Sequence, residues 1–178
     1  MEEPIRLVRD AAIERPAVDA PSSLSFEAFI EDHHARLFGA LCLVTGDRYE
    51  AEEIMQDAFV RVFEKWDRVS TLKDPTGYLY RTAMNVFRKR YRRAALALRR
   101  AVSLAPQDHW FAAAEDREVV LRGLVGIPAD QRAALVVTAL LGYSSEEAGR
   151  MLGASASTVR ARATRARAAL REAIGEDR

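Results

Sequence analysis

Apolar residues recur at helical spacing in three consecutive segments of the N-terminal half, which predicts three helices. In the middle segment, residues 51–66, they follow the i, i+3, i+4, i+7 pattern of a helix with one buried face. Ser25 stands where a side chain caps the first helix, and Asp74 precedes a proline at the start of the third. One apolar stripe per helix predicts a three-helix bundle over residues 25–93, with residues 67–74 as a loop.

The C-terminal half returns to helical periodicity after a segment that lacks it. Residues 94–115 fit no periodic element beyond a continuation of the preceding helix, so we expect a flexible linker there. Helices are expected near 116–125, 129–141, 145–152 and 156–173. Residues 1–24, with three prolines, are expected to form a flexible arm. The predicted fold class is therefore all-α, with a three-helix N-terminal bundle and a four-helix C-terminal domain at 116–178.

Charge is unevenly distributed along a chain whose net charge is only +1. Residues 81–100 contain eight basic residues and no acid, and residues 156–171 contain five basic residues and no acid. Two separate basic segments indicate two contacts with a polyanion, of which nucleic acid is the commonest. The alternative is that each segment is a solvated helix face. Residues 47–57 carry five acids and one arginine, which indicates a basic protein surface as a partner.

Residues 144–167 combine a helix, a glycine turn at Gly153 and a second, arginine-rich helix. This is the pattern of a helix-turn-helix motif, whose second helix enters the DNA major groove. Arginines bind guanine edges or phosphates, and hydroxyls bind backbone oxygens. The candidate DNA-binding residues are Ser157, Thr158, Arg160, Arg162, Thr164, Arg165 and Arg167. The alternative is an Ala/Arg-rich amphipathic helix in a plain bundle.

Other classes of protein are disfavoured by what the chain lacks. The single cysteine, Cys42, excludes an internal disulfide framework, and its apolar surroundings predict a core residue. His33 and His34 have no further ligand at metal-binding spacing. Without a phosphate loop or a nucleophile–base pair, we expect no catalytic residue, metal or cofactor. The longest uncharged apolar run, 37–46, is too short to span a bilayer, so we expect a cytoplasmic protein without membrane insertion.

The two halves together resemble a sigma factor of bacterial RNA polymerase, of the extracytoplasmic-function (ECF) group. Residues 51–63 resemble the family's A-E-D-L-V-Q-E-x-F-L-R-V-W helix, and the segment from residue 78 resembles W-L-Y-R-I-A-x-N-x-x-x-D-x-x-R-R. Residues 127–135, 146–149 and 157–162 resemble L-P-x-x-x-R-x-x-L, E-E-I-A and G-T-V-K-S-R. The motifs occur in the family's order over roughly 25–93 and 116–173.

The resemblance implies a role for each segment. Residues 25–93 correspond to sigma region 2, which binds core polymerase and recognises and melts the −10 element. Residues 116–178 correspond to region 4, whose arginine-rich helix recognises the −35 element. The implied partners are core polymerase, through its clamp helices and flap, promoter DNA and an anti-sigma factor. The implied core-binding residues are Glu53, Gln56 and Asp57, and the implied −10 DNA-binding residues are Tyr78, Arg81, Asn85, Arg88, Lys89 and Arg92. Residues 67–74 correspond to the pocket for a flipped base.

Several positions depart from the family motifs. Tyr78 replaces tryptophan, which predicts weaker base stacking, and Ala148 with Gly149 replaces Ile-Ala, which predicts thinner packing behind the recognition helix. A second hypothesis is a stand-alone helix-turn-helix transcriptional regulator, whose N-terminal bundle senses a ligand or dimerises. The acidic helix and the basic segment that follows it favour the sigma factor.

Overall fold

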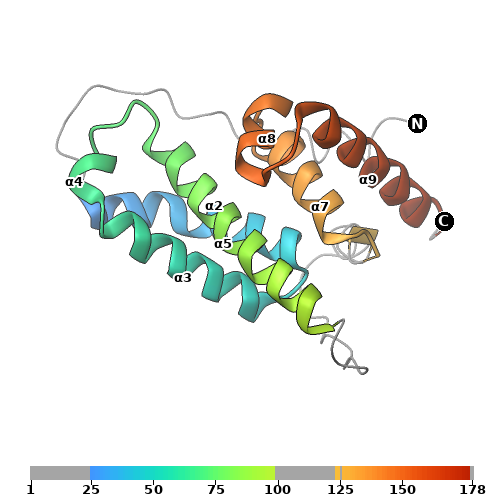
Figure 1. The fold of residues 1–178 in the computed structure, drawn as a ribbon, viewed down its shortest axis with the longest axis horizontal. Coiled ribbons are helices and arrows are strands. Elements are labelled where there is room, and N and C mark those ends of the chain that lie inside the picture. The colour runs from blue at the N-terminus through green and yellow to red at the C-terminus, as the bar shows by residue number, and fades with distance from the viewer. Residues whose placement is uncertain (1–24, 99–122, 125, 177–178) are drawn as a thin grey trace. The chain divides into compact units, whose positions relative to one another are not determined.

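The computed structural model describes residues 25–98, 123–124 and 126–176, and within these ranges it contains helices and no strand (Figure 1). The described helices belong to two compact units, one with α2 to α5 and one with α7 to α9. The prediction of an all-α protein with two helical domains is therefore confirmed. The predicted arm, most of the predicted linker and most of the helix expected at 116–125 lie outside the described residues.

The N-terminal unit consists of α2 (Phe26–Thr45), α3 (Arg48–Phe63), α4 (Trp66–Val69) and α5 (Pro75–Leu98). The helix ends follow local signals in the sequence. The Ser25 hydroxyl accepts a hydrogen bond from the first turn of α2, and Gly46 ends that helix in the left-handed conformation with φ of 73°. Asp74 accepts a hydrogen bond of 2.7 Å from the N–H of Gly77 and so caps α5.

The core of this unit forms where the apolar stripes of α2, α3 and α5 pack together. The stripe residues buried there are Phe29, Leu37, Leu41, Val44, Ala51, Ile54, Met55, Ala58, Phe59, Val62, Leu79, Ala83, Val86 and Phe87. Cys42 is also buried, as predicted, and burial raises the pKa of its thiol to about 11. A thiol in that state is largely unreactive, which fits a packing role.

The structure corrects the predicted end of the middle helix and the predicted loop at 67–74. The helix α3 ends at Phe63, which remains 60% exposed, and Trp66 begins the separate short helix α4. The Phe26 ring packs against the rings of Phe63 and Trp66, with centroid distances of 4.9 Å and 5.1 Å. Contacts of this kind, with the full burial of Val69, stabilise a helix too short to persist alone.

His33 links α2 to the start of α5. Its Nε2 lies 3.2 Å from the Thr76 hydroxyl, and its ring meets the edge of Phe29 at a centroid distance of 4.5 Å. Burial lowers the pKa of His33, and the neighbouring Arg36 lowers it further against an opposing effect of Asp32. The histidine is therefore a packing residue that favours its neutral form.

Acidification is expected to destabilise the N-terminal unit through His33. The pKa of His33 in the folded state lies below the usual 6.5, so the unfolded chain binds the proton more readily. The contribution of His33 to stability is therefore complete above pH 6.5 and is lost as the pH falls through the lowered pKa. The variant His33→Gln keeps a hydrogen-bonding side chain without a titrating group, so its unfolding free energy should vary less between about pH 7 and pH 5. Chemical denaturation at both values tests this. The control His34→Gln, at an exposed neighbour, should keep the wild-type pH dependence.

The C-terminal unit contains α7 (Ala129–Leu135), the π-helix η1 (Val136–Leu140), α8 (Ser145–Leu152) and α9 (Ala156–Glu176). A helix was expected over 129–141, but its second half is wider than an α-helix. The N–H of Leu141 bonds to the carbonyl of Val136, five residues back. The Thr138 hydroxyl donates to the carbonyl of Ala134 at 2.7 Å and so competes with the regular backbone pattern.

The helices α8 and α9 form the predicted helix-turn-helix motif (Figure 1). Ser144 and Glu147 form a reciprocal capping box at the start of α8, and Ser155 caps α9 through the N–H of Thr158. Gly153, with φ of 60°, makes the turn between them. The contact between the helices is sealed by Ala148, Met151, Leu152 and Val159, all of them buried as expected.

The sequence predicts thinner packing behind α9 at Gly149. The structure shows that the backbone of the turn lies close to α8 at this glycine. A Cβ atom at this position would lie only 2.6 Å from the carbonyl oxygen of Ala154. The N–H of Ala154 in turn donates to the carbonyl of Gly149 at 3.0 Å. The missing side chain therefore permits a close backbone approach.

Candidate nucleic-acid interface

One side of α5 presents a continuous set of polar and cationic groups. The set consists of the predicted residues Tyr78, Arg81, Asn85, Arg88, Lys89 and Arg92, which are exposed or half-buried. The buried residues Leu79, Ala83 and Val86 face the core. Arg88 donates to the Asn85 side-chain oxygen at 3.2 Å, so the guanidinium and the amide lie side by side. The structure thus places the six predicted residues along the outer side of one helix.

The outer face of α3 carries the predicted carboxylates, and Arg90 of α5 reaches across to them. The guanidinium of Arg90 contacts Glu53 closely and lies 3.5 Å from Asp57. The Glu53 hydrogen bond is the main cause of the raised pKa of Arg90. Gln56 bonds along its own helix to Glu52, at 3.5 Å. The predicted core-binding residues therefore share one surface, which also contains an arginine.

Burial and nearby charge affect a further carboxylate on this side of α3. The pKa of Glu50 is raised, first by burial and then by the charges of Asp47 and Glu53, while Arg90 opposes the shift. Arg90 is thus the cation that offsets an otherwise acidic cluster.

Three exposed apolar side chains lie on the outer face of α3, and none is predicted from the sequence as a surface contact. Phe63 follows the helical spacing of the buried stripe, which predicts a core position, and the structure shows that this prediction is wrong. Tyr49, Val60 and Phe63 are 79%, 57% and 60% exposed. They share this face with Glu53 and Gln56, because the five positions follow helical spacing from the first to the last turn. A second, weaker periodicity in the sequence was the signal for them, hidden behind the stronger core stripe. Exposed aromatic and aliphatic groups beside carboxylates are typical of a protein-binding surface.

Helix α9 buries one side and exposes the other. Val159, Ala163 and Ala166 are buried in the C-terminal unit. The predicted residues Ser157, Thr158, Arg160, Arg162, Thr164, Arg165 and Arg167 lie on its exposed and half-buried sides. Small side chains and hydroxyls between arginines leave a surface that fits a groove in duplex DNA.

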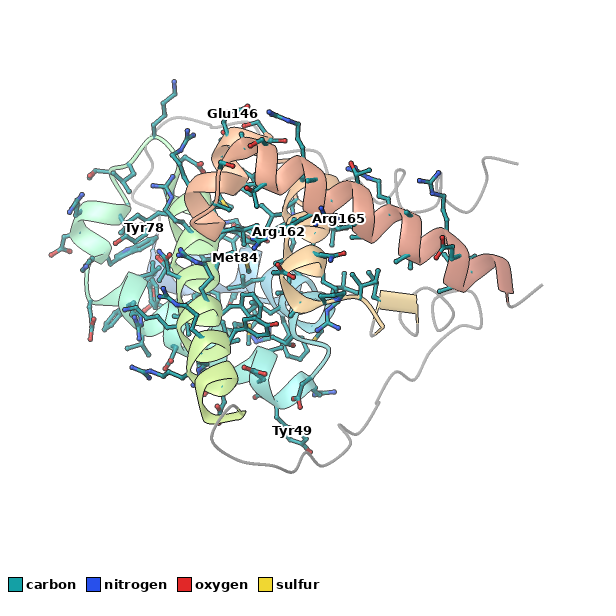
Figure 2. All side chains as sticks on the ribbon, turned by 45° about the vertical axis from the view of Figure 1, so that its right-hand side comes forward. Tyr49, Tyr78, Met84, Glu146, Arg162 and Arg165 are labelled. Atoms are coloured by element: carbon teal, nitrogen blue, oxygen red, sulfur yellow. The ribbon has the colours of Figure 1, made fainter. Side chains whose placement is uncertain are left out.

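Two arginines of α9 are held by carboxylates of the same unit (Figure 2). Arg160 pairs with Glu146 of α8 at 3.2 Å, and Arg162 pairs with Asp130 of α7 at 3.0 Å. Arg165 is exposed and forms no ion pair with any part of the chain that the structure describes. The arginines therefore differ in how readily they can reach an external phosphate or base.

Within the described ranges, no cluster of three histidine, cysteine or acidic side chains could hold a metal ion. None of the helices described there is long and apolar enough to cross a membrane.

Sequence comparison matches both units to known protein families. Residues 29–96 match the family Sigma-70 region 2, and residues 117–170 match Sigma-70, region 4. The ferric citrate uptake sigma factor FecI of Escherichia coli is 30% identical over 148 residues, which cover 78% of this chain and 84% of FecI. The chain belongs to the sigma-70 family, in its ECF group. The ECF RNA polymerase sigma factor SigM of Mycobacterium tuberculosis is 29% identical over 157 residues, covering 85% of this sigma factor and 78% of SigM.

Solved structures share the fold of this sigma factor. The sigma factor RpoE of Bartonella quintana, crystallised with the anti-sigma factor NepR, matches with a TM-score of 0.73 at 21% identity. That match covers 87% of this chain and 99% of RpoE. CnrH, solved with the cytosolic domain of CnrY, matches over the full length of both chains with a TM-score of 0.55 and 23% identity.

Family membership establishes the general function. The chain is an RNA polymerase sigma factor, a transcription initiation factor that acts with core polymerase on promoter DNA. The comparisons thus confirm the predicted sigma factor, and the alternative of a stand-alone regulator is rejected.

Proposed function

We propose that this sigma factor uses three separate surfaces: the outer face of α3 for core polymerase, the polar side of α5 for the −10 element, and α9 for the −35 element. The observation that carries the proposal is the charge segregation between helices. The face of α3 is acidic and apolar, whereas the exposed sides of α5 and α9 are cationic. A nucleic acid and a basic protein surface require these opposite characters.

On α5, each residue type suits a different part of melted promoter DNA. Tyr78 offers a ring on which an unpaired base can stack, and Asn85 offers an amide for its hydrogen-bonding edge. The cations Arg81, Arg88, Lys89 and Arg92 suit the phosphates of the displaced strand. Since α4 occupies the first part of the segment predicted as a loop, residues 70–74 remain as the pocket loop for a flipped base. Melting in this scheme is binding rather than catalysis, because exposed bases exchange stacking in the duplex for contacts with protein.

On α3, carboxylates and apolar groups act together. Glu53 and Asp57 suit basic groups of the polymerase clamp helices, and Gln56 offers an amide between them. Val60 and Phe63 supply apolar area that becomes buried in the complex, where aromatic and aliphatic anchors contribute much of the binding energy.

These roles assign residues 25–93 to sigma region 2 and residues 116–178 to sigma region 4.

The arginines of α9 are expected to differ in how much each contributes to −35 recognition. Arg165→Ala is expected to weaken recognition of the −35 duplex by about 1–3 kcal/mol. Arg162→Ala should cost less, because Asp130 already engages that side chain. Holoenzyme binding to promoters with intact and scrambled −35 elements measures both. As a control, Arg171→Ala removes the same charge from α9 outside the candidate set. If Arg165→Ala behaves like this control on both templates, Arg165 does not contact the DNA; equal weakening on both templates beyond that of the control would make it a general phosphate contact.

We further propose an anti-sigma factor as a partner and the cytoplasm as the location. A related fold has been solved with the anti-sigma factor NepR, and core polymerase and chromosomal DNA are both cytoplasmic. The protein would act without a catalytic residue, metal or cofactor of its own.

Reconstitution with purified core polymerase tests the proposed function. We expect holoenzyme to select promoters with defined −35 and −10 elements from a randomised template library and to start transcripts from them. Tight binding to a DNA site without core polymerase, together with no detectable core binding, would instead support a stand-alone regulator.

A further inference from the structure

Arg90 lies within the basic run of α5 but on a different side from the DNA-binding residues. It follows the buried residue Val86 by four positions and therefore lies above it, on the side of α5 that packs against α3. Five positions separate it from Asn85, which places it roughly 140° around the helix from that residue. Within the basic run, Arg90 is therefore turned toward α3, whereas Arg81, Arg88, Lys89 and Arg92 lie on the outward side.

The contacts of Arg90 fix both of its η nitrogens on carboxylates. One nitrogen meets Oε2 of Glu53, and the other lies 3.5 Å from Oδ2 of Asp57. The side chain of Arg90 is 33% exposed, while those of Glu53 and Asp57 are 63% and 45% exposed. A carboxylate has several acceptor sites, so each can still accept a hydrogen bond from an external cation. Arg90 therefore occupies the inner side of the carboxylates and leaves their outer side accessible.

We propose that Arg90 is a positioning residue for the core-docking surface rather than a ligand of DNA. It holds Glu53 and Asp57 in one orientation and offsets the repulsion between neighbouring carboxylates of α3. A surface ordered before binding loses less conformational freedom when a basic partner docks on it. This inference rests on the proposed function of α3 as the core-polymerase surface.

The test measures the dissociation constant for core polymerase by titration of labelled sigma factor. Arg90→Ala is expected to raise it roughly three- to tenfold, and Arg90→Lys, which keeps the charge, should recover part of the loss. Arg61→Ala is the matched control, because it removes the same charge from an exposed position of α3 that forms no hydrogen bond or ion pair with Glu53 or Asp57 in the described part of the chain. Circular dichroism and thermal unfolding verify that each variant is folded.

Two further measurements distinguish positioning from a merely structural role. In a Glu53→Ala background, the effect of Arg90→Ala on core binding should shrink, because its closest partner is already absent. At saturating core polymerase, binding of a single-stranded −10 oligonucleotide should be unchanged by Arg90→Ala but weakened by Arg88→Ala.

Three outcomes would overturn the inference: core binding by Arg90→Ala equal to that of the Arg61→Ala control, tighter core binding, or loss of oligonucleotide binding as large as that of Arg88→Ala. If the wild-type protein itself fails to bind core polymerase, the proposed function of α3 fails instead.

Discussion

Asp57→Arg is expected to eliminate core binding while leaving the N-terminal unit helical. The substitution presents a cation to a basic partner surface and also places a second guanidinium beside Arg90, which lies 3.5 Å from Asp57. Like charges brought together at an interface cost several kcal/mol, so we expect a loss of about 2 kcal/mol or more, which is at least roughly thirtyfold in affinity. Titration of labelled variant with core polymerase measures the loss.

The side chain of Asp57 is 45% exposed, so its replacement should leave the buried stripe of α3 intact. Circular dichroism should show wild-type helicity. Glu31→Arg makes the same change of charge at an exposed position of α2 and should bind core polymerase normally. Wild-type affinity in the Asp57→Arg variant would show that core polymerase docks elsewhere.

Gly149→Ala is expected to disrupt the helix-turn-helix motif, although alanine is the better helix former. The added Cβ would lie 2.6 Å from the carbonyl oxygen of Ala154, and a backbone atom cannot move aside as the end of a side chain can. Overpacking of this kind costs about 1–3 kcal/mol. We expect a lower unfolding temperature for the C-terminal unit and weaker binding to −35 duplex DNA, with core docking through α3 retained.

Gly175 offers a matched control for this substitution. It also lies in a helix of the C-terminal unit, but a Cβ there would meet nothing within 4 Å. Gly175→Ala should therefore be neutral or stabilise the unit by up to about 1 kcal/mol, as helix propensity predicts. Similar stability of the two variants would mean that the turn adapts to the added Cβ without cost.

Much of the fold could be predicted because its signals are local. A cap such as Ser25, a left-handed glycine such as Gly46 and a stripe at helical spacing each act within one helix, so they can be identified without knowing what that helix packs against. Family motifs in the same segments then indicated the function, and sequence comparison confirmed it.

The functional surfaces were predictable only in part, because residues of one type take different roles in three dimensions. Arg88 and Arg90 are two positions apart and look alike in the sequence. The fold turns one toward solvent beside Asn85 and the other toward the carboxylates of α3. In the same way, Arg162 pairs with Asp130, whereas Arg165 on the same helix is exposed.

From the sequence alone came the order of the main described helices, several of their caps, their buried stripes and the segments that carry opposite charge. Only the tertiary structure decided that Trp66 starts a new helix, that Phe63 stays exposed, that a π-helix follows α7, and which arginine meets which carboxylate. The division has one physical cause. Helix formation depends on neighbours a few positions away, whereas these other features depend on side chains that only packing brings together.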